Sequence, residues 1–390
     1  MPPDKNYFSS SSEFKIMVKT KLCVCLWRGA DFNAKQRPKA AWKIVCKEKK
    51  EGGLGVIDLK TQNEALLIKH LHKFFNKEDI PWVDLVWEKH YGNGKLPGNT
   101  KKGSFWWRDI LKLLSKYKGM AQVNINNGTT CLLWDDLWEG EVPTQKFPEL
   151  FSFAKDKRLT FAQATNQSPM HSLFNVPLSM QAHSQFLIFQ QKVQSVTISD
   201  QKDKWSYIWN SSKFSVKKTY RHLKGHNVVH QAYNWLWASS CQPKHKVFFW
   251  LVLKDRISTR ELLKRKNMQL QDYSCVLCNN ATEESLTHLL LECPFAVHCW
   301  GLVNIQIDHS LNPFQLLHSI REQLAVPFFM EIIVILAWTI WRSRNDLIFR
   351  GINPSLQLAY SNFKEEWKLL LLRAKRSYYP YIDQWTSNLN

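Results

Sequence analysis

Three cysteines and one histidine crowd into residues 275–293, and this cluster constrains the chain more than any other feature. The spacing is Cys275-x2-Cys278-x9-His288-x4-Cys293. Three thiolates and one imidazole are a preferred tetrahedral set for Zn²⁺, so the cluster predicts one structural zinc ion. His298 and Cys299 follow closely enough for either to replace the fourth ligand. In the alternative interpretation, the cysteines are buried thiols and the histidine lies on a helix surface.

The residues around the cluster argue against catalysis or phosphate binding at the metal itself. Four protein ligands leave no coordination position at which a water molecule could be activated. The region also carries Asp272, Glu283, Glu284 and Glu292, and no Lys or Arg occurs between residues 267 and 320. A centre with three thiolates is itself negative and would repel a phosphate. We therefore expect the metal to stabilise the fold, and its loss to unfold this region.

The formal net charge of +20 is typical of proteins with a polyanionic partner. The surplus falls in residues 1–120 and 201–300. Arg256, Arg260 and Lys264 recur at four-residue spacing, which predicts one helical stripe facing nucleic acid, either RNA or single-stranded DNA. The predicted contact residues are Lys244, Lys246, Lys254, Arg256, Arg260, Lys264, Arg265 and Lys266. A basic run over residues 35–50 is a second candidate, and an ordinary solvated helix face is the alternative.

The apolar pattern predicts an α+β fold, mainly helical, with two or more β-hairpins and a small zinc knuckle. A capping-box sequence at 61–64 precedes a helix that continues through residue 75. Further helical periodicity covers residues 231–238, 244–266, 285–300, 327–349 and 355–376. Alternating apolar residues predict hairpins at 121–134, around Asn127-Gly128, and at 205–216. Residues 1–20 are predicted to be a flexible tail, 155–204 a loosely packed connector and 301–390 a C-terminal helical segment.

No motif in the sequence indicates an enzyme. The stretch GNTKKGS at 98–104 resembles a phosphate-binding loop, but Ser104 stands where that loop needs a lysine. Asp135 and Asp136 are neighbours, and neighbours in a strand point to opposite faces, so we expect polar hairpin ends instead of a metal-binding pair. The chain is therefore predicted not to be an enzyme.

The sequence also bears on the compartment. Nine cysteines are too few and too unevenly spaced for a disulfide framework, which favours a reducing compartment. The first twenty residues carry no secretory signal, and the longest apolar run, 332–341, is too short to span a bilayer. We expect an intracellular protein without a membrane partner, with the nucleus favoured over the cytoplasm.

Six segments in collinear order over residues 20–350 resemble plant LINE-type (non-long-terminal-repeat) retrotransposon polyproteins. Residues 25–74 resemble the region after the polymerase palm. The others are LLWDDLWEG at 132–140, FPELFSFA at 147–154, WSYIWNSSKFSVKKTY at 205–220, the stretch from Trp235 through the cysteine cluster, and WTIWRSRNDLIF at 338–349. The resemblance implies a post-palm region over 21–154 and a reverse-transcriptase zinc-binding domain over 205–300. It also implies that Cys275, Cys278, His288 and Cys293 are the zinc ligands.

The function implied by this resemblance is that of a zinc-stabilised, non-catalytic nucleic-acid-binding module of a reverse transcriptase. The endonuclease, palm and ribonuclease H motifs of such polyproteins are not recognisable, so the chain resembles a carboxyl-terminal fragment. A polymerase or another retroelement protein would be a partner, and the sequence leaves the oligomeric state open. The alternative is a structural or protein-interaction fragment of a decayed element with no affinity for nucleic acid.

Overall fold

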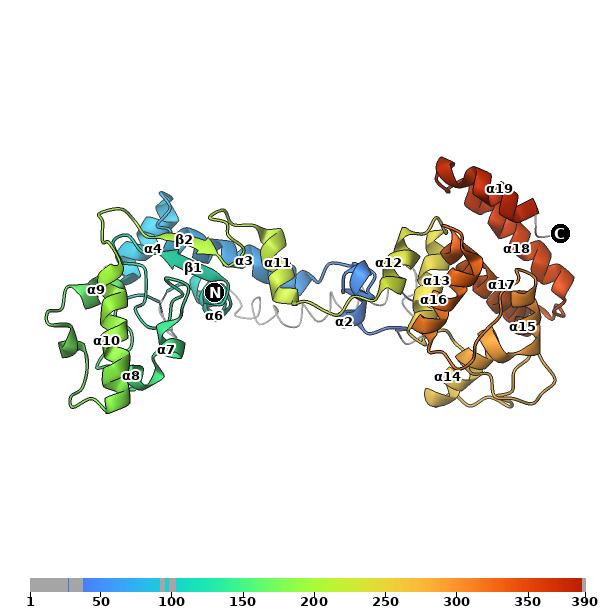
Figure 1. The fold of residues 1–390 in the computed structure, drawn as a ribbon, viewed down its shortest axis with the longest axis horizontal. Helices are drawn as coiled ribbons and strands as arrows, with labels where there is room; N and C mark the ends of the chain where they lie inside the picture. Colours follow the sequence, from blue (N-terminus) through green and yellow to red (C-terminus); the bar gives the residue numbers. More distant parts are fainter. Residues whose placement is uncertain (1–26, 28–37, 92–94, 98–102, 388–390) are drawn as a thin grey trace, which may run out of the picture. The chain divides into compact units, whose positions relative to one another are not determined.

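The computed structural model describes residues 27, 38–91, 95–97 and 103–387 (Figure 1). The chain forms two compact units. Unit 1 comprises Met1–Ile57 and Asn227–Asn390, and unit 2 comprises Asp58–His226. The predicted tail at 1–20, the first basic positions Lys35 and Arg37, and most of the 98–104 loop lie outside the described residues.

The mainly helical α+β class is confirmed, but the strands do not form two local hairpins. Strand β1 (Ala121–Asn124) pairs antiparallel with β2 (Lys204–Tyr207), so that Ala121 lies opposite Tyr207. The turn expected at Asn127-Gly128 is present, with Gly128 at φ +68°, yet no returning strand follows it. In the second predicted hairpin, residues after a Tyr207–Ser211 bridge enter a helix instead of a strand.

The buried carboxylate of Asp203 explains why β1 pairs with β2, which is distant in sequence, and not with a neighbouring segment. Asp203, just before β2, is 2% exposed. Its oxygens accept backbone N–H bonds from Asn126 and Gly128 at 2.8 Å and from Thr130 at 2.9 Å. A buried charge of this kind is stable only when its hydrogen bonds are satisfied. The loop after β1 is thereby fixed beside β2, which lies far along the chain.

Helices make up most of unit 2. They are α3 (Leu59–Phe75), α4 (Pro81–Tyr91), α5 (Phe105–Leu111), α6 (Leu114–Lys118), α7 (Pro143–Lys146), α8 (Pro148–Ser152), α9 (Phe161–Thr165), the 3-10 turn η2 (Met170–Leu173), α10 (Met180–Ser195) and α11 (Val216–Lys224). Helix α3 begins before the predicted capping box, because the side chain of Asp58 caps it by accepting from Lys60 N. Its buried face packs Phe74 and Phe75 into an aromatic core with Trp107 and Trp205.

Residues 155–204, which were expected to be a loosely packed connector, fold into this core. They contain α9, η2 and α10, and Phe161, Leu173 and Phe189 are buried. Phe189 stacks on Trp134 with ring centroids 4.8 Å apart. The helices of this segment were not predicted because its apolar residues are spaced irregularly between short elements, so no single helical or strand period dominates.

A buried histidine in unit 2 makes its stability depend on pH. His72 packs against the rings of Tyr207 and Phe214, and burial lowers the pKa of His72 to about 4, despite Glu78 at 4.0 Å. The His72 side chain therefore takes up a proton near pH 6.5 in the unfolded chain, but only near pH 4 in the folded unit. Stability should fall as pH drops from 6.5 to 4, by up to about 1.4 kcal/mol per pH unit. Urea unfolding at several pH values measures the slope of the free energy of unfolding against pH. This slope should be smaller in His72→Phe and unchanged in the control His183→Phe, whose side chain is exposed. Equal slopes in the two variants would show that His72 does not cause the pH dependence.

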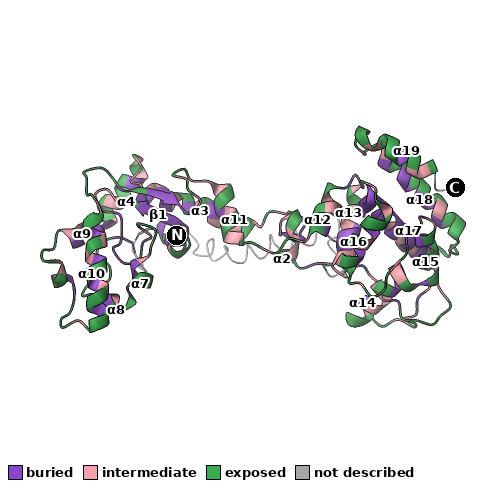
Figure 2. Cartoon of the chain, viewed as in Figure 1, coloured by how far each residue is buried: buried purple, intermediate pink, exposed green. Residues whose placement is uncertain are grey.

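Unit 1 holds the cysteine cluster. Its elements are α2 (Trp42–Val45), the 3-10 turn η1 (Lys49–Glu51), α12 (Gln231–Ala238), α13 (Pro243–Leu253), α14 (Arg260–Arg265), the π-helical turn η3 (His288–Glu292), α15 (Pro294–Gly301), α16 (Pro313–Leu324), α17 (Phe329–Arg350), α18 (Leu356–Leu371), the 3-10 turn η4 (Arg376–Tyr378) and α19 (Tyr379–Ser387). Figure 2 shows most of α17 buried, and α13, α15, α16 and α18 pack around it.

Two predicted helices of unit 1 are each divided. The 244–266 helix is broken after Leu253, where Asp255 takes φ +51°, and α14 starts anew with Thr259 capping Leu262 N. Arg256 lies in the break, so it does not share a helical stripe with Arg260 and Lys264. The 285–300 helix is divided where Pro294 starts α15, because proline has no N–H to continue the preceding turn.

One bent pair of helices is the only membrane-spanning candidate among the described residues. Within the described ranges, no single helix is long and apolar enough to cross a bilayer. Helices α16 and α17 are long and apolar enough to span a bilayer only when they are taken together, and a 116° bend separates them.

Candidate metal centre

The four ligand atoms predicted from the sequence converge on one point of unit 1. The sulfurs of Cys275, Cys278 and Cys293 and a ring nitrogen of His288 all lie within 4.8 Å of one another. The Sγ atoms of Cys275 and Cys293 are 3.9 Å apart, and Cys278 Sγ is 3.4 Å from His288 Nε2. A tetrahedral zinc ion, ~2.3 Å from sulfur and ~2.0 Å from nitrogen, separates two sulfurs by about 3.8 Å and a sulfur and a nitrogen by about 3.5 Å. The cluster therefore fits one zinc ion.

A short antiparallel ladder positions the first two ligands. Cys275 N donates to Thr282 O at 2.8 Å, and Glu284 N donates to Tyr273 O at 2.9 Å. The chain reverses at Ala281, which takes φ +50°. This ladder holds the CxxC loop as a closed knuckle, with Cys275 buried and Cys278 partly exposed.

The π-helical turn η3 positions the other two ligands. Its closing bond runs from Cys293 N to His288 O at 2.7 Å, five residues apart. In a regular α-helix, residues five apart point in different directions, because five steps of 100° leave a 140° offset. The wider π turn reduces this offset and brings Nε2 and Sγ toward the same point. Such turns occur frequently at functional sites.

The two alternative fourth ligands lie outside the cluster. His298 is exposed, and its Nδ1 is 2.6 Å from Pro294 O. Cys299 is fully buried, and burial raises the pKa of its thiol to about 12, so it stays protonated. Across the described ranges, no second group of three or more His, Cys, Asp or Glu side chains could hold a metal. Asp136 is buried and paired with Lys118 at 2.5 Å, whereas its neighbour Asp135 is exposed, so these two form no metal site.

A buried ion pair that sequence reasoning missed ties the metal loop to the central helix. Glu284 is 0% exposed and Arg344, on α17, is 4% exposed. The guanidinium of Arg344 donates to Glu284 from Nη2 at 2.7 Å and from Nε at 3.2 Å. Glu284 Oε1 also accepts from Arg260 N, the first residue of α14, at 3.0 Å. This single carboxylate therefore joins the knuckle, α14 and α17.

A sequence signal for Arg344 did exist. Ile333, Ala337, Ile340 and Arg344 recur at three- and four-residue spacing on one face of α17, and all four are buried. A cation on an apolar helix face needs a buried partner. The missing information was which acidic residue supplies it, since Glu284 lies 60 positions away.

Helix α14 pairs with two further acidic side chains near the knuckle, Asp272 and Glu283. Arg260 Nη1 donates to Ser274 O at 2.8 Å and to Asp272 at 3.2 Å, and Lys264 donates to Glu283 at 2.9 Å. Arg265 donates to Asp255 at 2.6 Å. The acidic loop and the basic helix, which the sequence suggested were separate surfaces, are thus one charge-paired structure.

The other predicted contact residues have mixed environments. Lys244 is 3.0 Å from Glu366. Lys246 donates to Trp237 O at 3.1 Å, and Lys254 lies over the ring of Tyr233. Lys266 ends α14. Arg256 is exposed, and its guanidinium has no partner among the described residues. Half of the eight predicted contacts are therefore committed to carboxylates of the same chain.

Comparison with known proteins agrees with the geometry of the cluster. Residues 214–300 match the family of zinc-binding regions in reverse transcriptases. The chain is also 26% identical, over 384 residues, to a protein of Arabidopsis thaliana named "Putative ribonuclease H protein At1g65750". The alignment covers 90% of this chain and 58% of that relative, so the chain spans little more than half of the relative's length. No solved structure matches the chain significantly.

Proposed function

We propose that the chain is a zinc-stabilised, non-catalytic module that binds single-stranded nucleic acid through basic side chains outside the metal centre. The observation that carries this proposal is the distribution of charge. The formal net charge of +20 exceeds what the internal ion pairs balance, whereas three acidic side chains of the metal loop are already paired with α14 and Arg344. A polyanion would be attracted to the uncompensated lysines and arginines and not to the zinc ion.

Helix α11 is the best candidate for the contact surface. It carries Lys217, Lys218, Arg221 and Lys224 and no acidic residue, and it lies within the matched 214–300 segment. Its opposite face packs on α3, where Tyr220 OH accepts from Asp58 N. Lys217 and Lys218 are exposed, and their side-chain ammonium groups have no partner among the described residues. A polyanion beside this face would be attracted to both cations and would release its own counterions on binding.

A non-catalytic role is part of this proposal. Four protein ligands would complete the coordination of the zinc ion, so it could not activate water. The ion would act only by holding the knuckle against α14 and α17. Nucleotide incorporation by the purified chain with Mg²⁺ would contradict this part.

The LINE-type origin suggested by the six collinear segments also belongs to the proposal. The zinc-binding match supports a retroelement-derived module. In this proposal the chain corresponds to the carboxyl-terminal part of such a polyprotein and acts in the nucleus beside a polymerase. Nuclear exclusion of a fluorescent fusion protein would count against that location.

The test is salt-dependent retention of a labelled single strand. Each phosphate contact should contribute about 0.7 to the slope of log affinity against log salt concentration. Lys217→Ala/Lys218→Ala should therefore weaken binding and reduce the slope by about 1.4. The matched control, Lys264→Ala/Arg265→Ala, removes the same charge from residues already paired with Glu283 and Asp255 and should change binding much less.

The second candidate function is a protein-interaction fragment, and the internal pairing of Lys244, Arg260, Lys264 and Arg265 favours it. If the chain does not bind the labelled single strand, or binds it with an affinity that does not depend on salt, the protein-interaction function is supported instead. Equal losses in both double variants would show that general charge, and not α11, holds the strand.

A further inference from the structure

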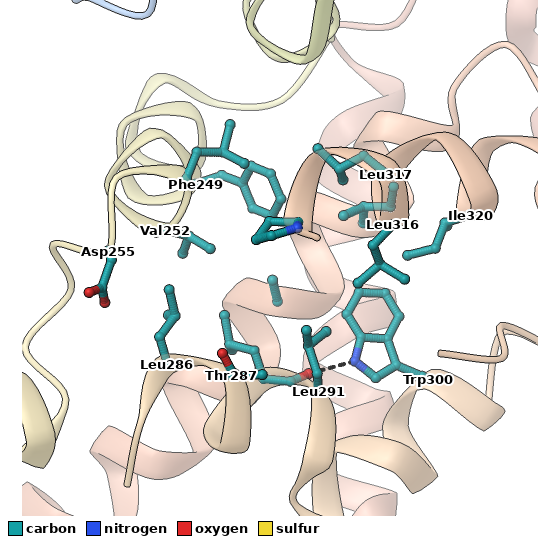
Figure 3. A pocket seen from close by; sticks show the side chains of 15 residues that line it. Phe249, Val252, Asp255, Leu286, Thr287, Leu291, Trp300, Leu316, Leu317 and Ile320 are labelled. Atoms are coloured by element: carbon teal, nitrogen blue, oxygen red, sulfur yellow. Dashed lines mark hydrogen bonds between the residues drawn. The ribbon is translucent and has the colours of Figure 1, made fainter. Parts of the chain in front are cut away.

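An apolar cavity of about 160 Å³ lies within unit 1, between α13, the turn that carries His288, and helices α15, α16 and α17. Figure 3 shows Phe249 from α13, Leu316, Leu317 and Ile320 from α16, and Trp300 from α15 around a common space. Ala337 and Ile333 of α17 complete the wall and are buried. Protein interiors are close-packed, and voids larger than a water molecule are few.

The interior of the cavity offers no free hydrogen-bond donor. Trp300 Nε1 is already bonded to Leu290 O at 2.7 Å, as the dashed line in Figure 3 marks. Thr287 is exposed and lies at the mouth. At one edge, Asp255 Oδ2 accepts a hydrogen bond from Arg265 Nη2, but Asp255 Oδ1 is buried without a hydrogen-bond partner among the described residues. The lining therefore suits hydrocarbon, with at most one acceptor at the edge.

The size and lining of this cavity define its ligand class. A cavity of ~150 Å³ lined by Leu, Ile and Phe stays dry and binds benzene, because water gains too few hydrogen bonds there. A charged ligand would lose its hydration without compensation. The geometry points to a binding site for a neutral aromatic molecule of one or two rings, carrying at most one N–H or O–H group. This site does not depend on nucleic-acid binding.

The cavity is built on the metal loop. Leu286, Thr287, Leu290 and Leu291 line it and flank the zinc ligand His288 on both sides in sequence. A ligand in the cavity contacts the π turn that positions His288 and Cys293, so its binding and the stability of the knuckle should be coupled reciprocally.

Indole binding to the full zinc-loaded chain tests the proposal. We expect saturable binding by ligand-observed NMR and a rise in the unfolding temperature. Two variants should fill the space from different sides: Ala337→Leu on α17 and Leu286→Trp at the partly exposed turn. Each should weaken indole binding by about tenfold or more. The matched control Leu324→Trp adds the same ring to α16 at a position outside the lining and should bind like the natural chain.

Helical signal and zinc content establish which variants are folded. If one filling variant fails to fold, the other decides. Absence of saturable indole binding to the natural chain, or undiminished binding to a folded filling variant, would show a packing void and overturn the proposal.

Discussion

Replacing Cys278 by serine should release the zinc ion and unfold the part of unit 1 that surrounds it. Cys278 Sγ lies 3.4 Å from His288 Nε2 in the four-ligand cluster, and serine is a poor zinc ligand at neutral pH. Zinc binding by closed sites of this kind supplies about 10–16 kcal/mol, which equals or exceeds the ~5–15 kcal/mol stability of a whole domain. Metal analysis should give about one ion for the natural chain and none for the variant, with loss of helical circular dichroism.

A second cysteine provides the control for this experiment. Cys299→Ser removes a thiol that is fully buried close to the cluster but outside it. It should retain the metal, with only the moderate destabilisation expected from burying a hydroxyl. Cys293→Ser, in contrast, should behave like Cys278→Ser. Full zinc content in Cys278→Ser, or loss of zinc in Cys299→Ser, would mean that the ligand set is wrong.

Arg344→Met should destabilise unit 1 by about 3–5 kcal/mol, the cost that follows when one partner of a buried ion pair is removed. The substitution leaves the Glu284 carboxylate 0% exposed without its bidentate cation. The double variant Arg344→Met/Glu284→Leu should recover only part of the loss: two well-packed apolar side chains are a tolerated replacement for such a pair, but the bond from Arg260 N to Glu284 is also removed. Urea denaturation of the single and double variants measures both effects.

The control for this pair lies on the same helix. Arg342 reaches Asp346 at 3.6 Å, and its side chain is 36% exposed. Exposed pairs contribute at most about 1 kcal/mol, so Arg342→Met should be nearly neutral. Similar losses of unfolding free energy in Arg342→Met and Arg344→Met would show that the buried contact with Glu284 stabilises this unit no more than an exposed ion pair does.

The parts of this molecule that the sequence predicts well are those fixed by local spacing. The metal cluster is one, because the three intervals between its four ligands are short and the ligand types are specific. The long α17 is another, since its apolar periodicity continues without a breaker from Phe329. In both, the information lies within a few turns of chain.

The parts that the sequence predicts poorly depend on partners far along the chain. β1 pairs with β2 because Asp203 binds the loop after β1, not because of any turn signal. The helical spacing of apolar residues continues through 254–259, but the helix itself is broken there. The cause of this break is the pairing of Arg260 and Glu261 backbone N–H groups with Glu284, a contact no periodicity contains. The same break leaves Arg256 outside α14, so the predicted single helical stripe of Arg256, Arg260 and Lys264 is not formed.

The division of the chain into two units has a practical consequence for cloning. The family match at 214–300 begins in α11, whose packing partner α3 belongs to unit 2, and it ends before α17 supplies Arg344. A protein expressed with those boundaries would lack both partners and would also lose the backbone acceptor that Gly52 offers to Trp250 Nε1 at 2.9 Å. Residues 38–57 and 227–387 together, joined by a short linker, keep both the Glu284–Arg344 ion pair and the bond from Trp250 to Gly52.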